Sequence, residues 1–331
     1  MSFTSTVDAL LAAHGIDPAT EVPFENDGWS GATLTRLHDG DGRPYVLKRD
    51  SFERDWIAQA THDEWMREIV VAHSADLLPA PIRYSALGAV REREQIAILM
   101  PDLTDVLFDW NATISIEQLD TVLAAMAAMH DETVEAFEVQ EAWTGWEDRI
   151  TLIGRPSLER PGPAHDAVAS RLLPGWDAWD RVATPRARSI IEGLSEDVEP
   201  LLDALGAERS GLIHGDLKLA NVGIARDGVV EMVDWQMVAT APAAVELGWF
   251  LVANVNSLTL TPSVVLDRYW AIRGSDAGRE NDLAILVGLL LRGWRKGLDA
   301  EAGVILASGV SAADDLAWWC DRTVEAAGRI L

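Results

Sequence analysis

Three side chains that carry oxygen atoms stand at a spacing that could do chemistry. Asn221 follows Asp216 by five residues, and Asp234 follows Asn221 by thirteen. Lys218 lies between the first two, which places a cation beside a carboxylate. Phosphoryl transfer needs such a set, because one carboxylate must take the proton of an acceptor hydroxyl while other oxygen atoms hold Mg²⁺ against phosphate groups. We therefore predict Asp216 as the base, Lys218 as a neutraliser of charge on the transferred group, and Asn221 and Asp234 as metal ligands.

A short β-ribbon is predicted to bring these residues together. Apolar runs at 211–213 and 229–233 flank them, and Arg226-Asp227-Gly228 between the runs is typical of a hairpin turn. The segment matches the H-x-D-x-K-x-x-N spacing of kinase catalytic loops, in which a metal-binding aspartate follows the next hairpin. His214, the first residue of this pattern, is predicted to be buried and bonded to backbone. Asp216 suits the role of base better, since a carboxylate is ionised at neutral pH.

Lysine is rare in this chain and stands at selected positions. Among 27 lysine and arginine residues only three are lysines, at Lys48, Lys218 and Lys296. Lysine provides a compact ammonium where arginine provides a planar fork. Lys48 ends the strand-like run 43–48, which is similar to the V-A-I-K strand whose lysine contacts ATP phosphates in kinases. We therefore predict a nucleotide contact for Lys48, whereas an ordinary surface position suffices for Lys296.

Two further features are expected to serve the nucleotide. An acidic residue of the following helix should hold the ammonium of Lys48 over the phosphates, and Glu64 and Glu68 stand one turn apart on the same face. The segment 27–33, with Ser30 and Gly31, precedes the Lys48 strand and could let backbone amides approach a phosphate. It lacks the full G-x-G-x-x-G pattern, so a plain turn is the alternative.

These motifs resemble those of the aminoglycoside phosphotransferase family, the small-molecule branch of the protein-kinase-like fold. The family's H-G-D-x-x-x-x-N stands at 214–221, and its D-W, here Asp234-Trp235, replaces the D-F-G of protein kinases. The resemblance extends from about Glu25 to the C-terminus. Two positions depart from the family: Lys218 stands where many members have histidine, and Glu246 stands where an aspartate usually braces the catalytic loop. Neither departure removes a reacting group.

The resemblance implies a bilobal α+β fold that uses ATP and Mg²⁺. A small β-rich lobe with one long helix would comprise residues 1–103 and bind the nucleotide. A large, mostly helical lobe, 104–331, would carry catalysis and bind the acceptor. The hinge would lie at about 100–105, where the backbone near Met100 would bind adenine. Arg67-Glu68 resembles the family's R-E pattern, which favours Glu68 over Glu64 as the partner of Lys48.

Hydrophobic patterns agree with two lobes of different composition. Residues 52–75 have the apolar spacing of one long helix, and residues 139–184 form the least regular stretch. Strands are predicted at 31–38, 43–48, 82–87 and 95–100. Further helices are predicted at 7–15, 119–130, 186–205, 243–255, 262–273, 281–296 and 312–330.

Composition places the chain among ordinary globular proteins and excludes nucleic acid as its partner. Of its 331 residues, 48% are hydrophobic and 24% are charged, and a net charge of −26 would repel nucleic-acid phosphates. No apolar run is long enough to span a membrane, and residues 1–16 lack the features of a signal peptide. The single Cys320 cannot form an intramolecular disulfide. We therefore expect a cytoplasmic enzyme.

The identity of the acceptor is the part of the function that the sequence predicts least well. Two similar stretches carry tryptophan pairs, Trp143/Trp146 and Trp176/Trp179, which are expected either to pack in the core or to line an acceptor pocket. The segment 139–184 and the later helices carry many carboxylates, and no arginine cluster on these segments stands clear of neighbouring acids, which predicts a neutral or cationic, sugar-like acceptor. An antibiotic, an amino sugar, a sugar or another metabolite fits equally.

Other classes of function fit less well. A protein kinase would show D-F-G, A-P-E and an activation loop after Asp234. A nucleotide-binding pseudokinase would have lost one of Lys48, Asp216, Asn221 or Asp234, and none is lost. A scaffold would leave the spacing of these four groups unexplained.

Overall fold

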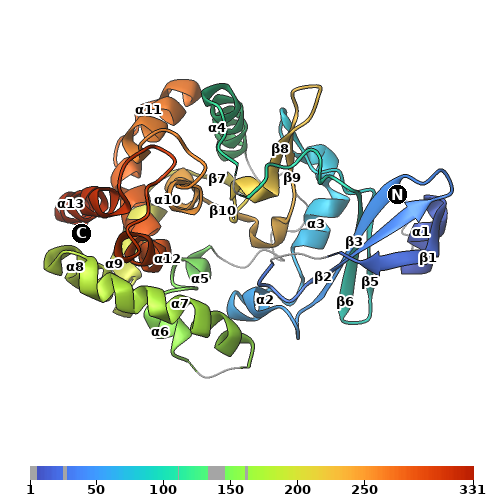
Figure 1. Ribbon diagram of the computed structural model, residues 1–331, viewed down its shortest axis with the longest axis horizontal. Coiled ribbons are helices and arrows are strands. Elements are labelled where there is room, and N and C mark those ends of the chain that lie inside the picture. Colours follow the sequence, from blue (N-terminus) through green and yellow to red (C-terminus); the bar gives the residue numbers. More distant parts are fainter. Residues whose placement is uncertain (1–5, 25–27, 111, 133–145, 161–162) are drawn as a thin grey trace.

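The computed structural model consists of a β-sheet part and a helical part, which lie next to each other along the longest axis of the molecule (Figure 1). It describes residues 6–24, 28–110, 112–132, 146–160 and 163–331. The β-rich N-terminal part and the mostly helical C-terminal part confirm the predicted α+β fold. Within the described ranges, no helix is both long enough and apolar enough to cross a membrane.

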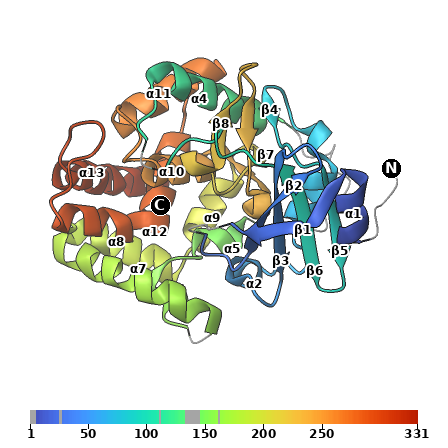
Figure 2. The same ribbon diagram turned by 45° about the vertical axis from the view of Figure 1, so that its right-hand side comes forward.

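The N-terminal part is built on a five-stranded antiparallel sheet with the strand order β1-β2-β3-β6-β5 (Figure 2). Lys48 lies within β3, where it pairs with Leu34 of β2 and Ile98 of β6. Helix α1, Val7–Ala13, buries Leu10 and Leu11 against this sheet. The strands span Ile16–Pro23 (β1), Thr33–Asp39 (β2), Pro44–Ser51 (β3), Gly88–Glu92 (β5) and Gln95–Pro101 (β6).

The two edge strands, β1 and β5, are absent from the predicted set. β1 contains Pro18 and Pro23, and its register shifts between Asp17 and Val22. Proline is tolerated at a sheet edge and at a bulge, because no ladder hydrogen bond is required there. The prediction of a strand at 82–87 is mostly wrong, since only Ile82–Arg83 (β4) is extended in a sheet, and this strand pairs with the helical part.

The predicted long helix at 52–75 is wrong as well. The segment forms two short helices, α2 (Trp56–Ala60) and α3 (Glu68–His73), and a 3-10 turn at Ala75–Leu77. Between the helices, His62 and Met66 have positive φ angles of 52° and 50°, which interrupt helical geometry.

A buried ion pair stabilises this interruption. The carboxylate of Asp63 accepts hydrogen bonds from the backbone amide of Arg67 and lies 3.1 Å from its guanidinium. Both side chains are only 3% exposed. An aspartate that bonds to nearby backbone competes with helix formation, and the apolar spacing of the segment does not reveal this.

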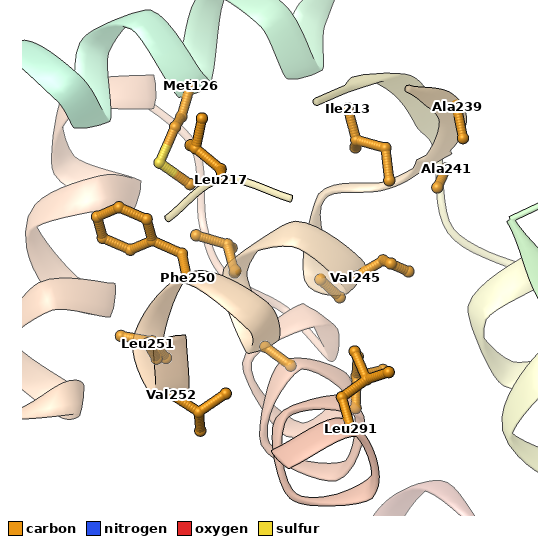
Figure 3. Packing of buried hydrophobic residues seen from close by; sticks show 14 of the residues in the cluster. Met126, Ile213, Leu217, Ala239, Ala241, Val245, Phe250, Leu251, Val252 and Leu291 are labelled. Carbon is orange, nitrogen blue, oxygen red and sulfur yellow. The ribbon is translucent and has the colours of Figure 1, made fainter. Parts of the chain in front are cut away.

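The C-terminal part is organised around α12, Glu280–Glu301, which packs against α7, α10 and α13. Helix α10 is nearly all buried, and its Phe250 packs near Met126 of α4 and near Leu217 of the predicted catalytic loop (Figure 3). The helices span Ile116–Asp131 (α4), Glu147–Ile150 (α5), Arg155–Leu158 (α6), Pro163–Val182 (α7), Pro185–Glu196 (α8), Glu199–Gly206 (α9), Ala243–Ala253 (α10), Pro262–Arg273 (α11) and Ala312–Ile330 (α13).

Two sequence predictions for this part need correction. The stretch 139–184 is not irregular as a whole, because α7 is a helix of 20 residues with Pro174 inside it. The predicted helix at 186–205 is divided into α8 and α9, since Asp197 leaves helical geometry just before Pro200.

Trp176 and Trp179 belong to the core and do not line an acceptor pocket. They are 3% and 1% exposed, and they pack edge to face against each other. A Cβ atom on Gly293 of α12 would come within 3.1 Å of the Trp176 ring, so a small residue is needed at this helix contact. Trp143 lies outside the described residues, and Trp146 is partly buried against the core.

The prediction that Lys296 is an ordinary surface lysine is wrong. It is 3% exposed, pairs with Asp315 at 2.5 Å and lies over the ring of Trp319. A buried ammonium needs a partner of opposite charge, and Asp315 on α13 supplies it.

Candidate active site

Residues 210–242, which contain the predicted catalytic residues, take part in two small sheets and do not form one ribbon. Strand β7, Ser210–Ile213, pairs with β10, Ala239–Pro242, whereas β8, Val222–Ile224, pairs with β9, Val230–Met232. The predicted hairpin turn lies between β8 and β9, where Gly228 has a φ of 83°. β9 also pairs in parallel with β4, which connects the β8–β9 hairpin to the N-terminal part.

The backbone of the catalytic loop is held from below by α10. Glu246 accepts hydrogen bonds from the amides of Gly215 at 2.6 Å and His214 at 3.3 Å. Asn254 accepts one from the amide of Leu219 at 2.7 Å. Glu246 therefore braces the loop, as the family resemblance implies for the aspartate that usually stands at this position.

His214 has a structural environment, as predicted. It is fully buried, its Nε2 lies 3.0 Å from the carbonyl of Val233, and its Nδ1 accepts a hydrogen bond from the amide of Asp216. Burial lowers the pKa of the His214 imidazole and outweighs the nearby carboxylates of Glu246 and Asp216.

Asp216, Lys218 and Asn221 lie together. The Lys218 ammonium donates to the Asp216 carboxylate at 2.8 Å, and the Asn221 amide nitrogen donates to the Asp216 backbone carbonyl at 3.0 Å. The Asp216 side chain is 14% exposed. Burial would lower the pKa of Lys218, but the carboxylates of Asp216 and Asp234 outweigh it and raise that pKa.

Asp234 joins this cluster to the N-terminal part. Its backbone is left-handed, with φ 68° and ψ 57°, and its carboxylate accepts a hydrogen bond from Lys48 at 2.6 Å. Burial would raise the pKa of this carboxyl, but the ammonium groups of Lys48 and Lys218 outweigh it and lower the pKa to about 2. Asp234 is therefore a carboxylate at neutral pH.

Glu68 is the acidic residue beside Lys48. The two side chains lie 2.6 Å apart and are 3% and 7% exposed, whereas Glu64 is exposed. Tyr84 donates a hydrogen bond to the other oxygen of Glu68. Burial opposes the charge on Lys48, but Asp234 and Glu68 outweigh it and raise the pKa of the lysine. The choice between Glu64 and Glu68, open from spacing alone, falls on Glu68.

The backbone conformation and the packing of Gly31 require a glycine at this position, whether or not the segment binds phosphate. Its φ is 112°, and a Cβ atom there would lie 2.3 Å from the carbonyl oxygen of Arg54. The carbonyl of Ser30 accepts a hydrogen bond from the amide of Trp56. The segment thus packs against the turn before α2, and its contact with phosphate stays a prediction.

Met100 lies near the end of β6, opposite Val46 of β3. Directly after this strand, the amide of Asp102 bonds to the carbonyl of Pro44, and the Asp102 carboxylate pairs with Arg36 at 2.7 Å. These contacts fix the chain where the sequence places the hinge. The contact with adenine stays a prediction.

Two buried arginines near the catalytic loop are absent from the predicted set. Arg149 of α5 donates to the carbonyl of Met237 at 3.0 Å, and Arg67 donates to the carbonyl of the next residue, Val238, at 3.3 Å. A Cβ atom on Gly215 would come within 2.0 Å of the Arg149 guanidinium, so the H-G-D glycine leaves room for it. The R-E dipeptide was a signal for Arg67, whereas nothing in the sequence around 149 indicates this contact.

The donor set fits magnesium. The Asn221 amide nitrogen bonds to backbone and leaves the amide oxygen as a ligand, and Asp234 has a second carboxylate oxygen beside the one that holds Lys48. Among the described residues, no group of three or more His, Cys, Asp or Glu side chains could hold a metal ion. Mg²⁺ suits such a sparse set, because it is commonly held by one or two carboxylates together with phosphate oxygens and water.

Fold and site together define a kinase-like phosphotransferase. The sequence profile of a phosphotransferase enzyme family, APH, matches residues 21–281, and the chain belongs to this family. This confirms the resemblance seen in the motifs. No protein with a curated description matches the chain.

Solved structures of three phosphotransferases are similar in fold. An aminoglycoside phosphotransferase from Alicyclobacillus acidocaldarius has a TM-score of 0.53 at 16% identity, covering 100% of this chain and 98% of that one. A spectinomycin phosphotransferase in complex with ADP and spectinomycin has a TM-score of 0.53 at 15% identity, covering 95% and 94%. A type I macrolide 2'-phosphotransferase has a TM-score of 0.50 at 18% identity, covering 98% and 99%.

Proposed function

We propose that this phosphotransferase moves the γ-phosphoryl group of ATP to a hydroxyl group of a small polar molecule, with Mg²⁺ as cofactor. The contact between Lys48 and Asp234 at 2.6 Å carries the proposal. In this contact, Lys48 of the N-terminal sheet binds Asp234, the carboxylate that the family motif assigns to the metal. Asp216 lies beside these groups with its own cation, Lys218. Residues 1–103 would bind the nucleotide, and residues 104–331 would bind the acceptor and catalyse transfer.

The described side chains account for the steps of such a transfer. Lys48, held by Glu68, would bind oxygens of the α- and β-phosphates, and the backbone near Met100 would bind adenine. Asp216 would take the hydroxyl proton while the acceptor oxygen bonds to the γ-phosphorus and the bond to the β–γ bridging oxygen breaks, leaving its electrons on ADP. Mg²⁺, held by Asn221 and Asp234, would neutralise charge on the phosphate oxygens. Lys218 would face the transferred group.

A neutral or cationic acceptor, sugar-like or amine-bearing, is part of the proposal. The net charge of −26 favours cations over anions near the protein. One similar structure contains spectinomycin, which supports an antibiotic-like acceptor, and an amino-sugar or other metabolite kinase is the alternative. The buried Trp176 and Trp179 no longer support stacking on the acceptor. A cytoplasmic location agrees with the buried, unpaired thiol of Cys320.

Measurement of ADP release tests the proposal. Purified protein with ATP and Mg²⁺ would be offered aminoglycosides, amino sugars, sugars, nucleosides and amino alcohols in parallel, together with acceptors that carry a carboxylate or a phosphate. Acceptor-dependent ADP release, with mass spectrometry showing one added phosphoryl group, is the expected result. ATP binding without release for any acceptor would favour the pseudokinase alternative. Turnover of carboxylate- or phosphate-bearing acceptors alone would contradict the predicted charge of the acceptor.

A further inference from the structure

Arg292 is a buried cation without an anionic partner in the described part of the molecule. Its side chain lies on α12, at a residue where the helix departs from helical geometry with φ −135° and ψ 21°. Arg292 is 9% exposed, and its Nε atom has no hydrogen-bond partner. By contrast, Lys48 and Lys296 pair with buried or partly buried carboxylates within 2.6 Å.

Such a cation is costly unless something compensates for its lost hydration. Burial lowers the pKa of Arg292 to about 10, although the Asp216 carboxylate opposes this. Proteins rarely retain a desolvated guanidinium that has neither a carboxylate nor a full set of hydrogen-bond acceptors. A ligand with oxyanion character would supply both the negative charge and the hydrogen-bond acceptors.

Two tryptophans hold the guanidinium in place. The centre of the guanidinium lies 4.9 Å from the ring centroid of Trp249 and 5.3 Å from that of Trp294. Stacking on indole rings orients the planar fork of an arginine without using its N–H donors. This stacking therefore uses none of the N–H donors of Arg292.

The position of Trp249 connects Arg292 to the catalytic loop. Trp249 stands on α10 between Glu246 and Asn254, whose side chains bond to the loop amides of Gly215 and Leu219. The charged neighbours of Arg292 include Asp216, Lys218, Arg295, Lys296 and Asp299. Arg292 thus lies on the helical part, near Asp216 and Lys218.

We propose that Arg292 binds an oxyanion on the acceptor side of Asp216, and that this oxyanion is an oxygen of the phosphoryl group during and after its transfer. The inference rests on the proposed function. Lys48 and the metal ligands serve the phosphates that remain on ADP, whereas Arg292 and Lys218 stand where negative charge arrives on the acceptor. Guanidinium donors bind phosphoryl oxygens in a bidentate manner, which strengthens and orients the contact. An acidic group of the acceptor itself would have the same chemistry and is the other source to be distinguished.

Arg292→Gln tests the proposal, with Arg295→Gln as the matched control. Arg295 stands three residues further along α12, its side chain is 39% exposed, and it pairs with Asp299 at 3.0 Å. For any acceptor that the wild-type protein uses, Arg292→Gln should lower kcat about 10²-fold and leave the affinity for ADP with Mg²⁺ within about twofold. Arg295→Gln should match the wild type in both. If kcat of the two variants agrees within about threefold, the proposal is wrong.

The same variants distinguish the two sources of the oxyanion. Loss of kcat with every acceptor indicates the transferred phosphoryl group. A rise in KM confined to acceptors with a carboxylate or phosphate, with kcat preserved, indicates the acceptor's own acidic group and overturns the phosphoryl assignment.

A binding measurement keeps this test separate from the proposed function. Inorganic phosphate would be titrated calorimetrically into protein with ADP and Mg²⁺. The wild type and Arg295→Gln should bind phosphate, and Arg292→Gln should bind it roughly tenfold more weakly. Equal phosphate affinity in all three proteins overturns the proposal, whether or not any acceptor is phosphorylated. If Arg292→Gln fails to fold, Arg292→Lys replaces it. A preserved melting temperature with several-fold weaker phosphate binding is then expected, because the fork is lost while the charge stays.

Discussion

At the scale of single residues, opposite charges hold the candidate site in order. Lys48 contacts both Glu68 and Asp234 at 2.6 Å, and Lys218 contacts Asp216 at 2.8 Å. Each carboxylate with a proposed reacting or metal-binding role thus has an ammonium partner. Removal of one member leaves a buried or partly buried charge without compensation, so substitutions that keep the shape are the more informative ones.

Asp216→Asn should leave ATP binding nearly intact while lowering turnover. An amide keeps the shape of the side chain but cannot take the hydroxyl proton, and general-base assistance contributes about 10²–10⁴-fold. ADP release and ATP affinity would be measured on the same preparation. Wild-type turnover in this variant would remove Asp216 from the role of base.

Asp234→Ala should abolish the gain in nucleotide affinity that Mg²⁺ provides, and Asn221→Ala should reduce it less. An amide oxygen is a poorer ligand than a carboxylate for a hard cation. Titration of ATP with and without Mg²⁺ gives the ranking. Asp227→Ala is the control, because Asp227 lies in the hairpin turn of the same ribbon and its side chain is 55% exposed. The reverse ranking would contradict the assignment of ligands.

Site residues that belong to a local motif could be predicted from the sequence. Residues that come into contact only through the tertiary fold could not. Asp216 and Asn221 stand within six residues, and Asp234 follows a short hairpin. Their spacing in the sequence therefore largely determines how they are arranged in space. Arg149 contacts a carbonyl 88 residues away, and Arg292 stacks on a tryptophan of another helix. Neither contact leaves a periodic or motif signal in one sequence.

At the scale of elements, α10 positions the catalytic loop. Its Glu246 also lies 3.0 Å from the imidazole of His130, whose other nitrogen lies 2.7 Å from the hydroxyl of Tyr269. Burial opposes ionisation of Glu246, but His130, His214 and the Gly215 amide outweigh it and lower the pKa of the carboxyl. A carboxylate on α10 thereby connects α4 and α11 to the loop.

Glu246→Gln should lower both the free energy of unfolding and the turnover number. The amide accepts the Gly215 hydrogen bond without charge, and loss of a charge-assisted bond costs about 1–3 kcal/mol. Because the folded-state pKa of Glu246 is below its usual value, its stabilising contribution is present above that usual pKa and is lost as pH falls. Urea unfolding at pH 7 measures the change. Glu196→Gln, at an exposed position of α8, should unfold like the wild type; equal stability of the two variants would refute the brace.

Elements with a strong, continuous pattern were predicted well, and those shaped by tertiary contacts were not. α11 and α13 begin and end where the periodicity places them. The division of 52–75 into α2 and α3 depends on the Asp63–Arg67 pair, and Arg67 in turn bonds to Val238, 171 residues away. Local spacing does not contain that information.

At the scale of the whole molecule, several contacts between the N-terminal and the helical part lie at or next to the site. β4 pairs with β9, Arg67 bonds to Val238, and Lys48 pairs with Asp234. The stability of the N-terminal part and the geometry of the site are therefore coupled. Asp50 near the end of β3 and Asp55, the N-cap residue of α2, are two further buried carboxyls of the N-terminal part, each 1% exposed.

Asp55 should make the stability of the whole protein fall as pH rises from about 4 to about 8. Burial and the neighbouring Asp50 carboxyl raise the pKa of Asp55 to about 8, against the opposing charge of Lys48. A raised folded-state pKa means that the contribution is complete below the unfolded pKa, 3.8, and is lost as pH rises through about 8. The Asp55 carboxyl also caps α2 by accepting hydrogen bonds from the amides of Ile57 and Ala58 at 2.7 and 3.1 Å.

Asp55→Asn isolates this effect, because the amide oxygen still accepts both capping hydrogen bonds and the amide nitrogen can still donate to Asp50. The difference in unfolding free energy between variant and wild type should therefore grow in favour of the variant by roughly 1 kcal/mol per pH unit between pH 5 and pH 8. Urea unfolding at four pH values measures it. Asp41→Asn, at a side chain that is 76% exposed, serves as the surface control and should parallel the wild type. A difference between Asp55→Asn and wild type that stays constant with pH would show that Asp55 binds its proton no more tightly in the folded protein than in the unfolded chain.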